Sequence, residues 1–257
     1  MRLDVEMVNR GLVGTRNKAK ELVVSGKVCC DGKCIQKPAF DVDNTTKIEI
    51  KGVLKYVSRG GLKLEKALNV FGINMGGRVM LDIGSSTGGF TDCALKHGVK
   101  KVFAVDVGSG QLDNSLRLDN RVIVYENTDI RKADLSAFKD VDIISIDVSF
   151  ISVTKIVYVL EKLPNVKEII CLIKPQFECG MEVAKKFKGI IKDSVYHIKA
   201  INDVVNAFES IGFSLQGIIH SPIKGGDGNI EYLAYFGSEE KKTDISNVVK
   251  EAFDILI

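Results

Sequence analysis

Seven short apolar segments, separated by stretches of helical character, dominate the sequence from residue 78 onward. Continuous apolar runs such as 143–146 and 169–173 are typical of strands that are buried on both faces of a sheet. Strands that alternate with helices predict an open, doubly wound, mostly parallel α/β sheet. The predicted strands are 78–83, 101–107, 121–125, 141–147, 168–173, 214–220 and 231–236, and the clearest helices are 193–211 and 243–256.

The first fifty residues follow a different pattern, that of a small α+β unit. Two short helices are predicted, the second with Thr15 as its N-cap, followed by short strands around the Asp31-Gly32 turn. Residues 1–60 hold 12 Lys and Arg against 7 Asp and Glu, a net charge of +5. This charge fits a nucleic-acid contact module, and a solvated basic surface explains it equally well. The predicted helices are 3–10 and 16–24, and the predicted strands are 27–30, 33–35 and 47–50.

Several classes of protein are disfavoured by composition. No apolar run reaches the roughly 18 residues of a membrane span, and the N-terminus lacks a signal pattern, so a cytoplasmic protein is expected. The six cysteines are expected to be reduced thiols. Cys29, Cys30 and Cys34 lack a fourth ligand, because the first histidine is His97, so neither zinc nor any other metal is expected.

A glycine-rich turn, LDIGSSTGGF at 81–90, follows the first strand of the large sheet. Asp82 at the strand end suits a cationic amine better than a pyrophosphate, which it would repel. Ser86 stands where the dinucleotide pattern requires its second glycine. These features favour S-adenosylmethionine, which carries an amine and a sulfonium and no phosphate. Asp106 is expected to bind ribose hydroxyls. Asp129 is expected to bind the adenine amino group, although a strand-end turn residue explains it equally.

Two charged residues end neighbouring strands of the predicted sheet. Asp147 follows the fourth strand and Lys174 the fifth, so both fall at the edge where open α/β sheets bind ligands. A buried ion pair without chemistry is the alternative interpretation. We favour a catalytic role, because both residues lie at the cofactor edge.

Six segments together resemble one family: SRGGLKL, LDIGSSTGGFTD, DVGSGQLD, IDVSFIS, IKPQFE and GNIEY. They are similar to the TlyA-type proteins, known both as hemolysins and as rRNA 2′-O-methyltransferases with an FtsJ-like catalytic domain. The first fifty residues resemble the S4 RNA-binding module. The resemblance implies a Rossmann-like methyltransferase sheet behind a small α+β S4-like domain. We expect an S4-like domain at 1–51, a linker at 52–57 and a methyltransferase domain at 58–257.

The resemblance also implies a reaction, the S-adenosylmethionine-dependent methylation of a cytidine 2′-hydroxyl in rRNA. 23S rRNA of the large subunit is the expected substrate, and 16S rRNA is the other candidate. The family's Lys-Asp-Lys-Glu tetrad falls on Lys63, Asp147, Lys174 and Glu231. Lys174 is the expected base. Lys63 would stabilise the developing alkoxide, and the two acids would orient the lysines.

Two further sets of residues are expected to bind ligands. The cofactor set is Asp82, Gly84, Ser85, Ser86, Thr87, Gly88, Gly89, Phe90, Asp106, Val107, Gln111, Asp129 and Asp147. The RNA set is Arg2, Arg16, Lys18, Lys20, Lys27 and Arg59.

Three other functions compete with this interpretation. A nucleotide-dependent oxidoreductase is opposed by Asp82 and by the missing second glycine. A membrane-active hemolysin is opposed by the absence of a long apolar span and by acids in the last predicted helix. A non-catalytic RNA-binding assembly factor is opposed by the complete tetrad.

Overall fold

The computed structural model describes residues 1–52, 54–239 and 241–256. The chain divides into two compact units, Met1–Arg59 and Gly60–Ile257. Val53, within the expected linker, and Ile257, at the end of the expected second domain, lie outside the described residues.

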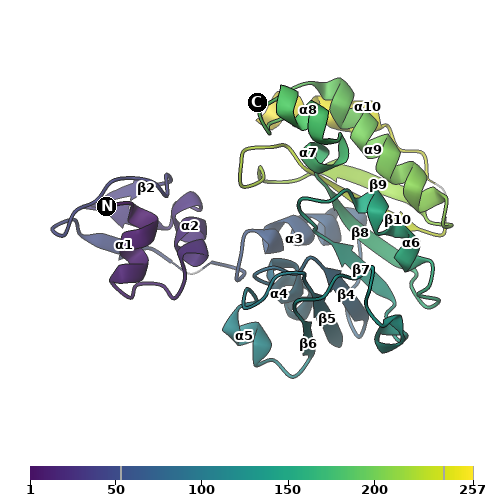
Figure 1. The fold of residues 1–257 in the computed structure, drawn as a ribbon, viewed down its shortest axis with the longest axis horizontal. Coiled ribbons are helices and arrows are strands. Elements are labelled where there is room, and N and C mark those ends of the chain that lie inside the picture. Colours follow the sequence, from purple (N-terminus) through teal and green to yellow (C-terminus); the bar gives the residue numbers. More distant parts are fainter. Residues whose placement is uncertain (53, 240, 257) are drawn as a thin grey trace. The chain divides into compact units, whose positions relative to one another are not determined.

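The first unit packs two helices on a small antiparallel sheet, as predicted (Figure 1). Thr15 caps α2 by accepting a hydrogen bond from the backbone N–H of Lys18. The sheet has the strand order β2-β1-β3, and the apolar sides of both helices pack with it into one core. The elements are α1 (Leu3–Asn9), α2 (Arg16–Val24), β1 (Val28–Cys30), β2 (Lys33–Ile35) and β3 (Ile48–Ile50).

One prediction for this unit is wrong. Cys29 and Cys34 are joined by a disulfide, although all six cysteines were expected to be reduced. The two residues are direct partners across the β1–β2 hairpin, so the register places one side chain opposite the other. Among the described residues Cys30, Cys171 and Cys179 are free thiols.

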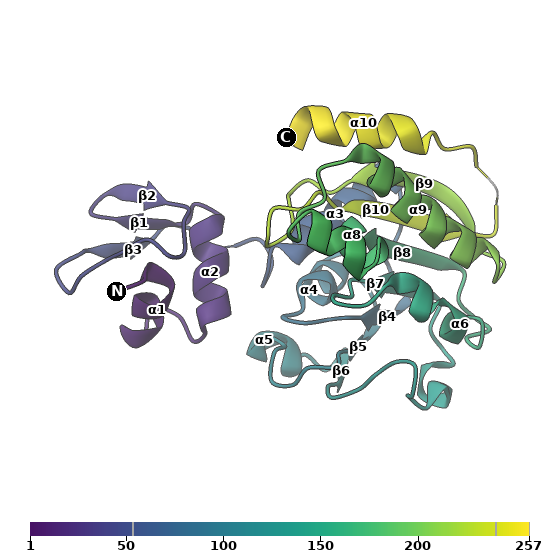
Figure 2. The same ribbon diagram turned by 45° about the horizontal axis from the view of Figure 1, so that its top comes forward.

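The second unit is the predicted doubly wound sheet, with strand order β6-β5-β4-β7-β8-β10-β9. Within the described residues β10 pairs antiparallel with both β8 and β9, and the other strand pairs of this sheet are parallel. Figures 1 and 2 show α3 and α4 on one side of the sheet and α6 and α9 on the other. The strands are β4 (Val79–Ile83), β5 (Lys101–Val105), β6 (Val122–Tyr125), β7 (Ile143–Ile146), β8 (Glu168–Ile173), β9 (Ser214–His220) and β10 (Tyr232–Gly237).

Successive side chains of a strand point to opposite faces of the sheet, so they pack against different helix layers. Leu81 and Ile83 of β4 belong to the cluster that α6 and α9 complete, whereas Asp82 between them faces the α4 side. The helices of this unit are α3 (Gly60–Phe71), α4 (Gly89–Lys96), α5 (Asn114–Arg117), α6 (Val157–Leu160), α7 (Pro175–Glu178), α8 (Met181–Lys186), α9 (Ser194–Glu209) and α10 (Ile245–Leu256), with 3₁₀ turns η1 (Leu135–Phe138) and η2 (Val153–Lys155).

A buried carboxylate joins the two helices of the first unit. Asp4 accepts from Arg2 at 2.9 Å and from Arg16 at 2.8 Å, and its side chain is fully buried. The hydrogen bond from Arg2, aided by Arg16, lowers the pKa of Asp4 to about 2 against the effect of burial. The charged form is therefore favoured by folding, and its contribution is present above the unfolded pKa and lost as the pH falls towards 2.

We expect Asp4→Asn to destabilise the first unit by about 2 kcal/mol at pH 7, the equivalent of the pKa shift. Hydrogen exchange of the α1 and β1 amides in the full chain measures this change. The difference between variant and wild type should shrink as the pH falls from 4 to 2. A difference that is constant over that range would show that the charge of Asp4 is not the cause.

Candidate active site

The sheet topology brings four charged side chains to one edge. Asp147 follows β7 and Lys174 follows β8, and these strands are parallel neighbours. β10 pairs antiparallel with β8, with Tyr232 opposite Ile173, so Glu231 arrives beside Lys174. Lys63 comes from α3, which contacts β10. Residues separated by up to 168 positions in the sequence therefore meet where parallel strands end.

The four side chains form two ion pairs. Lys63 Nζ lies 2.5 Å from Glu231 Oε2, and Lys174 Nζ lies 2.6 Å from Asp147 Oδ1. All four are largely buried, with Asp147 the most accessible. A Cβ on Gly225 would collide with the Glu231 carboxylate, so the loop before β10 needs a glycine there.

Electrostatics hold the second pair in its charged form. Burial opposes the ammonium of Lys174, but Asp147 and Glu231 outweigh it and raise the pKa of Lys174. Burial likewise opposes the carboxylate of Asp147, yet Lys174 and Lys63 hold its pKa below the usual range. Lys174 is thus an ammonium at neutral pH, and it must lose a proton before it can accept one.

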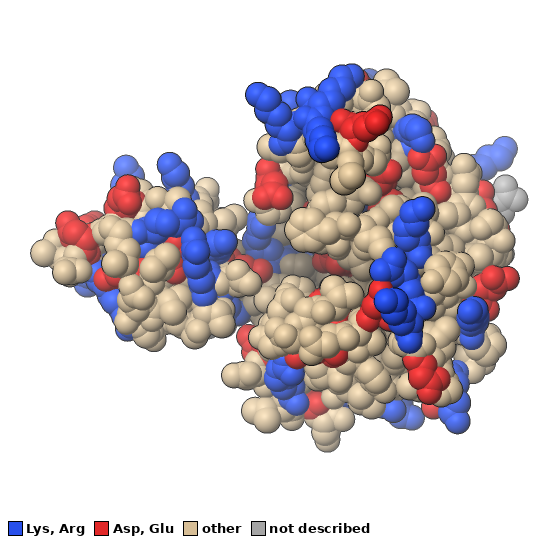
Figure 3. Space-filling view, in the orientation of Figure 1, with Lys and Arg blue, Asp and Glu red and all other residues tan. Residues whose placement is uncertain are grey.

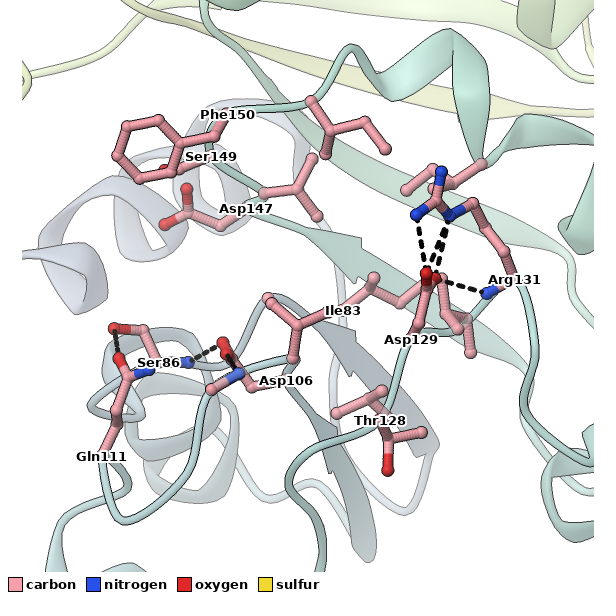
Figure 4. Close-up of a pocket in the computed structure, with 18 residues that line it drawn as sticks. Ile83, Ser86, Asp106, Gln111, Thr128, Asp129, Arg131, Asp147, Ser149 and Phe150 are labelled. Atoms are coloured by element: carbon pink, nitrogen blue, oxygen red, sulfur yellow. Dashed lines mark hydrogen bonds and ion pairs between the residues drawn. The ribbon is translucent and has the colours of Figure 1, made fainter.

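A cavity of 510 Å³ opens at this edge, and Asp147 is one of its lining residues (Figure 4). This volume falls within the roughly 300–1,000 Å³ of small-molecule sites. Its walls combine apolar side chains with the loops that follow β4, β5, β6 and β7. The charged side chains among the described lining residues are three carboxylates and one guanidinium, those of Asp106, Asp129, Asp147 and Arg131. A negative surplus favours a cationic ligand over a phosphate.

The glycine turn after β4 forms one wall by its backbone. Gly84 has a φ of +82°, and a Cβ there would lie 2.5 Å from the carbonyl oxygen of Asp147. A side chain is therefore excluded both by conformation and by the approach of β7. Asp106 accepts from the backbone N–H groups of Ser86 and Gly108, one on each carboxylate oxygen (Figure 4). Each oxygen keeps a further lone pair for a ligand.

The predicted cofactor residues separate into two groups. Those that line the cavity are Gly84, Ser86, Asp106, Val107, Gln111, Asp129 and Asp147. Those that are not among its lining residues are Asp82, Ser85, Thr87, Gly88, Gly89 and Phe90. In the second group Asp82 belongs to β4, and the other members form the turn and the start of α4. A Cβ on Gly88 would collide with Leu112 and Leu116.

Asp82 is buried inside the fold, where it connects neighbouring elements. Its carboxylate is fully buried and accepts from Thr91 Oγ1 and Ser145 Oγ, both at 2.6 Å. These bonds tie β4 to the start of α4 and to the strand that carries Asp147. Burial raises the pKa of Asp82 to about 6, although both hydroxyls oppose the rise.

Asp129 lies in the cavity, but it already has a cationic partner. Arg131 donates to both carboxylate oxygens of Asp129, at 2.9 Å and 2.6 Å (Figure 4). The hydrogen bond from Arg131 lowers the pKa of Asp129. An adenine amino group would therefore share this carboxylate with a guanidinium.

Three residues near the tetrad were missed by the sequence analysis. Ser149 accepts a hydrogen bond from Lys174 Nζ at 2.9 Å. Phe150 lines the cavity with a side chain that is 92% exposed, on a backbone with a φ of +65°. Glu178 is bonded to the loop after β7. The signal that could have found the first two is the run VSF, which directly follows Asp147 at the strand end.

The predicted RNA residues lie in the first unit, where Lys and Arg side chains gather in Figure 3. Arg2 and Arg16 are committed to Asp4 through one side of each guanidinium, but their side chains remain about half exposed. Lys18 Nζ donates to the carbonyl of Val57 at 2.6 Å. Lys20 is exposed, and Lys27 and Arg59 are half-buried.

Neither a metal-ligand cluster nor a membrane-spanning helix is found among the described residues. Within 1–52, 54–239 and 241–256, no group of three or more His, Cys, Asp or Glu side chains is arranged to hold a metal ion. None of the helices in that part of the chain combines the length and apolarity needed to cross a membrane.

Two family models cover most of the chain. Residues 56–238 match the FtsJ-like methyltransferase model, and residues 1–47 match the S4 domain model. The candidate rRNA methyltransferase YqxC of Bacillus subtilis is 44% identical over 99% of this chain and 95% of its own length.

Two relatives are named TlyA. The 23S rRNA (cytidine-2′-O)-methyltransferase of Campylobacter jejuni is 38% identical over 92% of this chain and 99% of its own. The 16S/23S rRNA (cytidine-2′-O)-methyltransferase of Mycobacterium tuberculosis is 38% identical over 93% and 90%. Among solved structures, a protein from Streptococcus thermophilus described as a candidate hemolysin aligns with a TM-score of 0.77. It is 41% identical and covers 99% of this chain and 96% of its own.

The buried carboxyl of Asp82 leads to a prediction about stability. The folded pKa of Asp82 is raised to about 6, so the protonated carboxyl favours the folded state. This contribution to the free energy of unfolding is fully present below the unfolded pKa and is lost as the pH rises through 6. Asp82→Asn mimics the protonated form, so we expect it to stabilise the protein at pH 8 by up to about 3 kcal/mol. Urea unfolding at pH 5 and pH 8 measures the change.

The matched control is Asp140→Asn, which neutralises an exposed carboxylate and should leave the pH dependence of unfolding unchanged. If Asp82→Asn destabilises the protein equally at both pH values, the ionised form of Asp82 is required by the fold.

Proposed function

The chain belongs to the FtsJ-like methyltransferase family, in the group with an N-terminal S4 domain that includes TlyA, and we propose that it methylates a ribose 2′-hydroxyl of rRNA with S-adenosylmethionine. The observation that carries this proposal is the assembly of Lys63, Asp147, Lys174 and Glu231 into two buried ion pairs beside a cavity. A ribose hydroxyl is a weak nucleophile until its proton is removed, and a lysine next to the cavity can remove it.

S-adenosylmethionine fits the cavity on three grounds. Asp129 is paired with Arg131 and Asp147 with Lys174, so the remaining negative charge of the lining is that of Asp106, which favours a ligand with positive charge. Asp106 offers oxygen lone pairs to ribose hydroxyls, and apolar side chains such as Val105 and Ile130 offer a surface for adenine. The backbone at Gly84 allows close approach. When bound, this cofactor supplies an electrophilic methyl group on a positively charged sulfur.

The tetrad residues divide the work on the acceptor nucleotide. Lys174 Nζ, once it has lost its proton, accepts the proton of the 2′-hydroxyl. Lys63 Nζ remains an ammonium and stabilises the negative charge that develops on that oxygen. Asp147 and Glu231 fix the direction of the two amines through the ion pairs. A positive charge at the neighbouring cofactor site would favour the neutral form of Lys174 and oppose the effect of the acids.

Phe150 supports a nucleotide as the acceptor. A ring exposed to 92% at a cavity that Asp147 and Ser149 also line is costly in water, and it is useful as a stacking surface for an unpaired base. The base would stack on Phe150 while the ribose faces Lys174.

The first unit supports RNA as the larger substrate. Its exposed cations would contact phosphates, which gives affinity with little sequence preference. Arg2 and Arg16 keep free N–H donors on their exposed sides. Lys20, Lys27 and Arg59 complete the proposed surface, together with Lys18.

We place the acceptor in a cytidine of 23S rRNA, in the free RNA or the large subunit, within the cytoplasm. The Campylobacter jejuni relative, which the chain covers over 99% of its length, is named for that substrate. 16S rRNA is the second substrate to test, because the Mycobacterium tuberculosis relative is named for both.

The first experiment combines transfer and binding. Purified protein is incubated with labelled S-adenosylmethionine and 16S rRNA, 23S rRNA or ribosomal subunits, and the label is located on ribose or base. We expect ribose label in 23S rRNA. Lys174→Ala should lower the transfer rate by at least about 10³-fold while the cofactor still binds in calorimetry. Cofactor binding without label on any RNA would favour an assembly factor.

Lys174→Arg separates two roles of the lysine. Arginine keeps the positive charge but cannot accept a proton. We expect this variant to be as inactive as Lys174→Ala. Substantial transfer by Lys174→Arg would contradict the base role and assign Lys174 to electrostatic stabilisation.

The pH dependence of the rate gives a further prediction. Asp147 and Glu231 raise the pKa of Lys174, so the neutral base is scarce at pH 7 and becomes more abundant as the pH rises. At saturating substrates the rate should rise about tenfold per pH unit between pH 7 and 9. Single-turnover measurements test this. A rate that is flat over the range would show that another group accepts the proton.

A further inference from the structure

Glu178, the last residue of α7, is hydrogen-bonded to the C-terminal end of the loop that follows β7. Its Oε2 accepts from Ser152 Oγ at 2.5 Å, and its Oε1 accepts from the backbone N–H of Val153 at 3.0 Å. Ser152 is the N-cap of the 3₁₀ turn η2, so Glu178 caps the same turn from outside. Both carboxylate oxygens are therefore used to fix where the loop ends.

The N-terminal end of this loop is held by the residue that begins α7. Lys174, the N-cap residue of α7, donates to Ser149 Oγ and pairs with Asp147. Residues four apart in a helical turn lie on the same side, so Lys174 and Glu178 can reach one neighbouring segment. Segment 149–152 is thus anchored at both ends by α7.

Between these anchors the backbone is strained. Phe150 has a φ of +65°, a left-handed conformation that costs a non-glycine residue about 1–3 kcal/mol and persists only where the surroundings impose it. Its exposed ring has few neighbours to impose that conformation, although it meets Phe177 of α7 at 5.2 Å. The anchors at Ser149 and Ser152 are the contacts that can hold it.

The surroundings of Glu178 indicate that its main role is to hold the loop that follows β7. Burial raises the pKa of Glu178, and the bonds from Ser152 and Val153 only partly offset that effect. Glu178 does not line the cavity and is not part of either tetrad ion pair. Burial disfavours the Glu178 carboxylate, and both of its oxygens accept hydrogen bonds from the same loop. Glu178 therefore acts through that loop.

We propose that Glu178 is a positioning residue that sets the shape of segment 149–152 and thereby holds the Phe150 ring where the acceptor nucleotide stacks. This proposal rests on the proposed function, because it assigns Phe150 to the acceptor side. It predicts that loss of Glu178 weakens the use of RNA more than it weakens cofactor binding, although Ser149, Phe150 and Ile151 also line the cavity.

Kinetics with three variants provide the first test. Glu178→Ala should raise the KM for the RNA substrate about tenfold, which matches the loss of two hydrogen bonds, and should change the cofactor Kd much less than the KM. Glu178→Gln should restore the KM, because an amide can accept from Val153 and donate to Ser152. Glu182→Ala is the matched control. It removes an exposed carboxylate from the first turn of α8, and it should behave as wild type.

A second test does not need activity. The chain has no tryptophan, so Phe150→Trp introduces a single fluorophore on the loop. Its steady-state anisotropy should fall when Glu178→Ala is added, stay unchanged with Glu178→Gln, and stay unchanged with Glu182→Ala. This measurement is made on the full chain without RNA.

The outcomes separate the two proposals. If the wild-type protein transfers no methyl group, the proposed function fails, and the anisotropy still decides whether Glu178 shapes the loop. Equal KM values for Glu178→Ala and wild type, or unchanged anisotropy, would overturn the positioning role. A fall in cofactor affinity and melting temperature as large as the change in KM would overturn it too, since Glu178 would then be a general structural residue.

Discussion

Two buried lysine–carboxylate pairs are the constraint around which the second unit is arranged. A charge removed from water costs several kcal/mol unless a partner of opposite sign and good geometry replaces the solvent. Lys63 and Glu231, and Lys174 and Asp147, meet that condition at 2.5 Å and 2.6 Å. Among the described residues β10 is the one strand that runs against the rest of the sheet, and its direction is compatible with this requirement. Because β10 runs antiparallel to β8, its N-terminal end brings Glu231 to the edge where β7 and β8 deliver Asp147 and Lys174.

Several carboxylates of this molecule fall into two groups, those that hold elements of the fold together and those that face the cavity. Burial distinguishes the two groups. Asp82 is fully enclosed, holds two hydroxyls and ties the glycine turn to β7, whereas Asp106 and Asp147 face the cavity. Asp4 has the same tying role in the first unit, where it joins α1 to α2 through Arg2 and Arg16. Asp82 is penalised by burial without a cation, and Asp4 is stabilised by two cations, so their pKa values shift in opposite directions.

The helix turn α7 links the reactive edge to the outer surface. Lys174 at its start belongs to the tetrad, and Glu178 at its end holds η2. The strained and exposed Phe150 lies on the loop between these anchors. A short helix that follows a buried strand is a stiff support, and groups placed on it keep their geometry better than groups on a free loop. The lysine and the aromatic ring are therefore coupled by one element.

The sequence by itself determined the sheet class, the two-part organisation and the tetrad. Apolar runs have a period set by backbone geometry, and Asp147 and Lys174 directly follow such runs, so both features are visible in one dimension. Lys63 and Glu231 were expected from the resemblance of their motifs to the family. Helix α2 with its cap at Thr15 was predicted for the same local reason. Only the tertiary structure decided what depends on distant partners. It placed Asp82 beside Thr91 and Ser145 instead of in the cavity, and it revealed the contacts of Glu178. It also fixed two pairs that are close in sequence, Asp129 with Arg131 and Cys29 with Cys34. Composition and spacing identify a side chain's chemistry, but burial and partners determine whether that chemistry faces a ligand or the core.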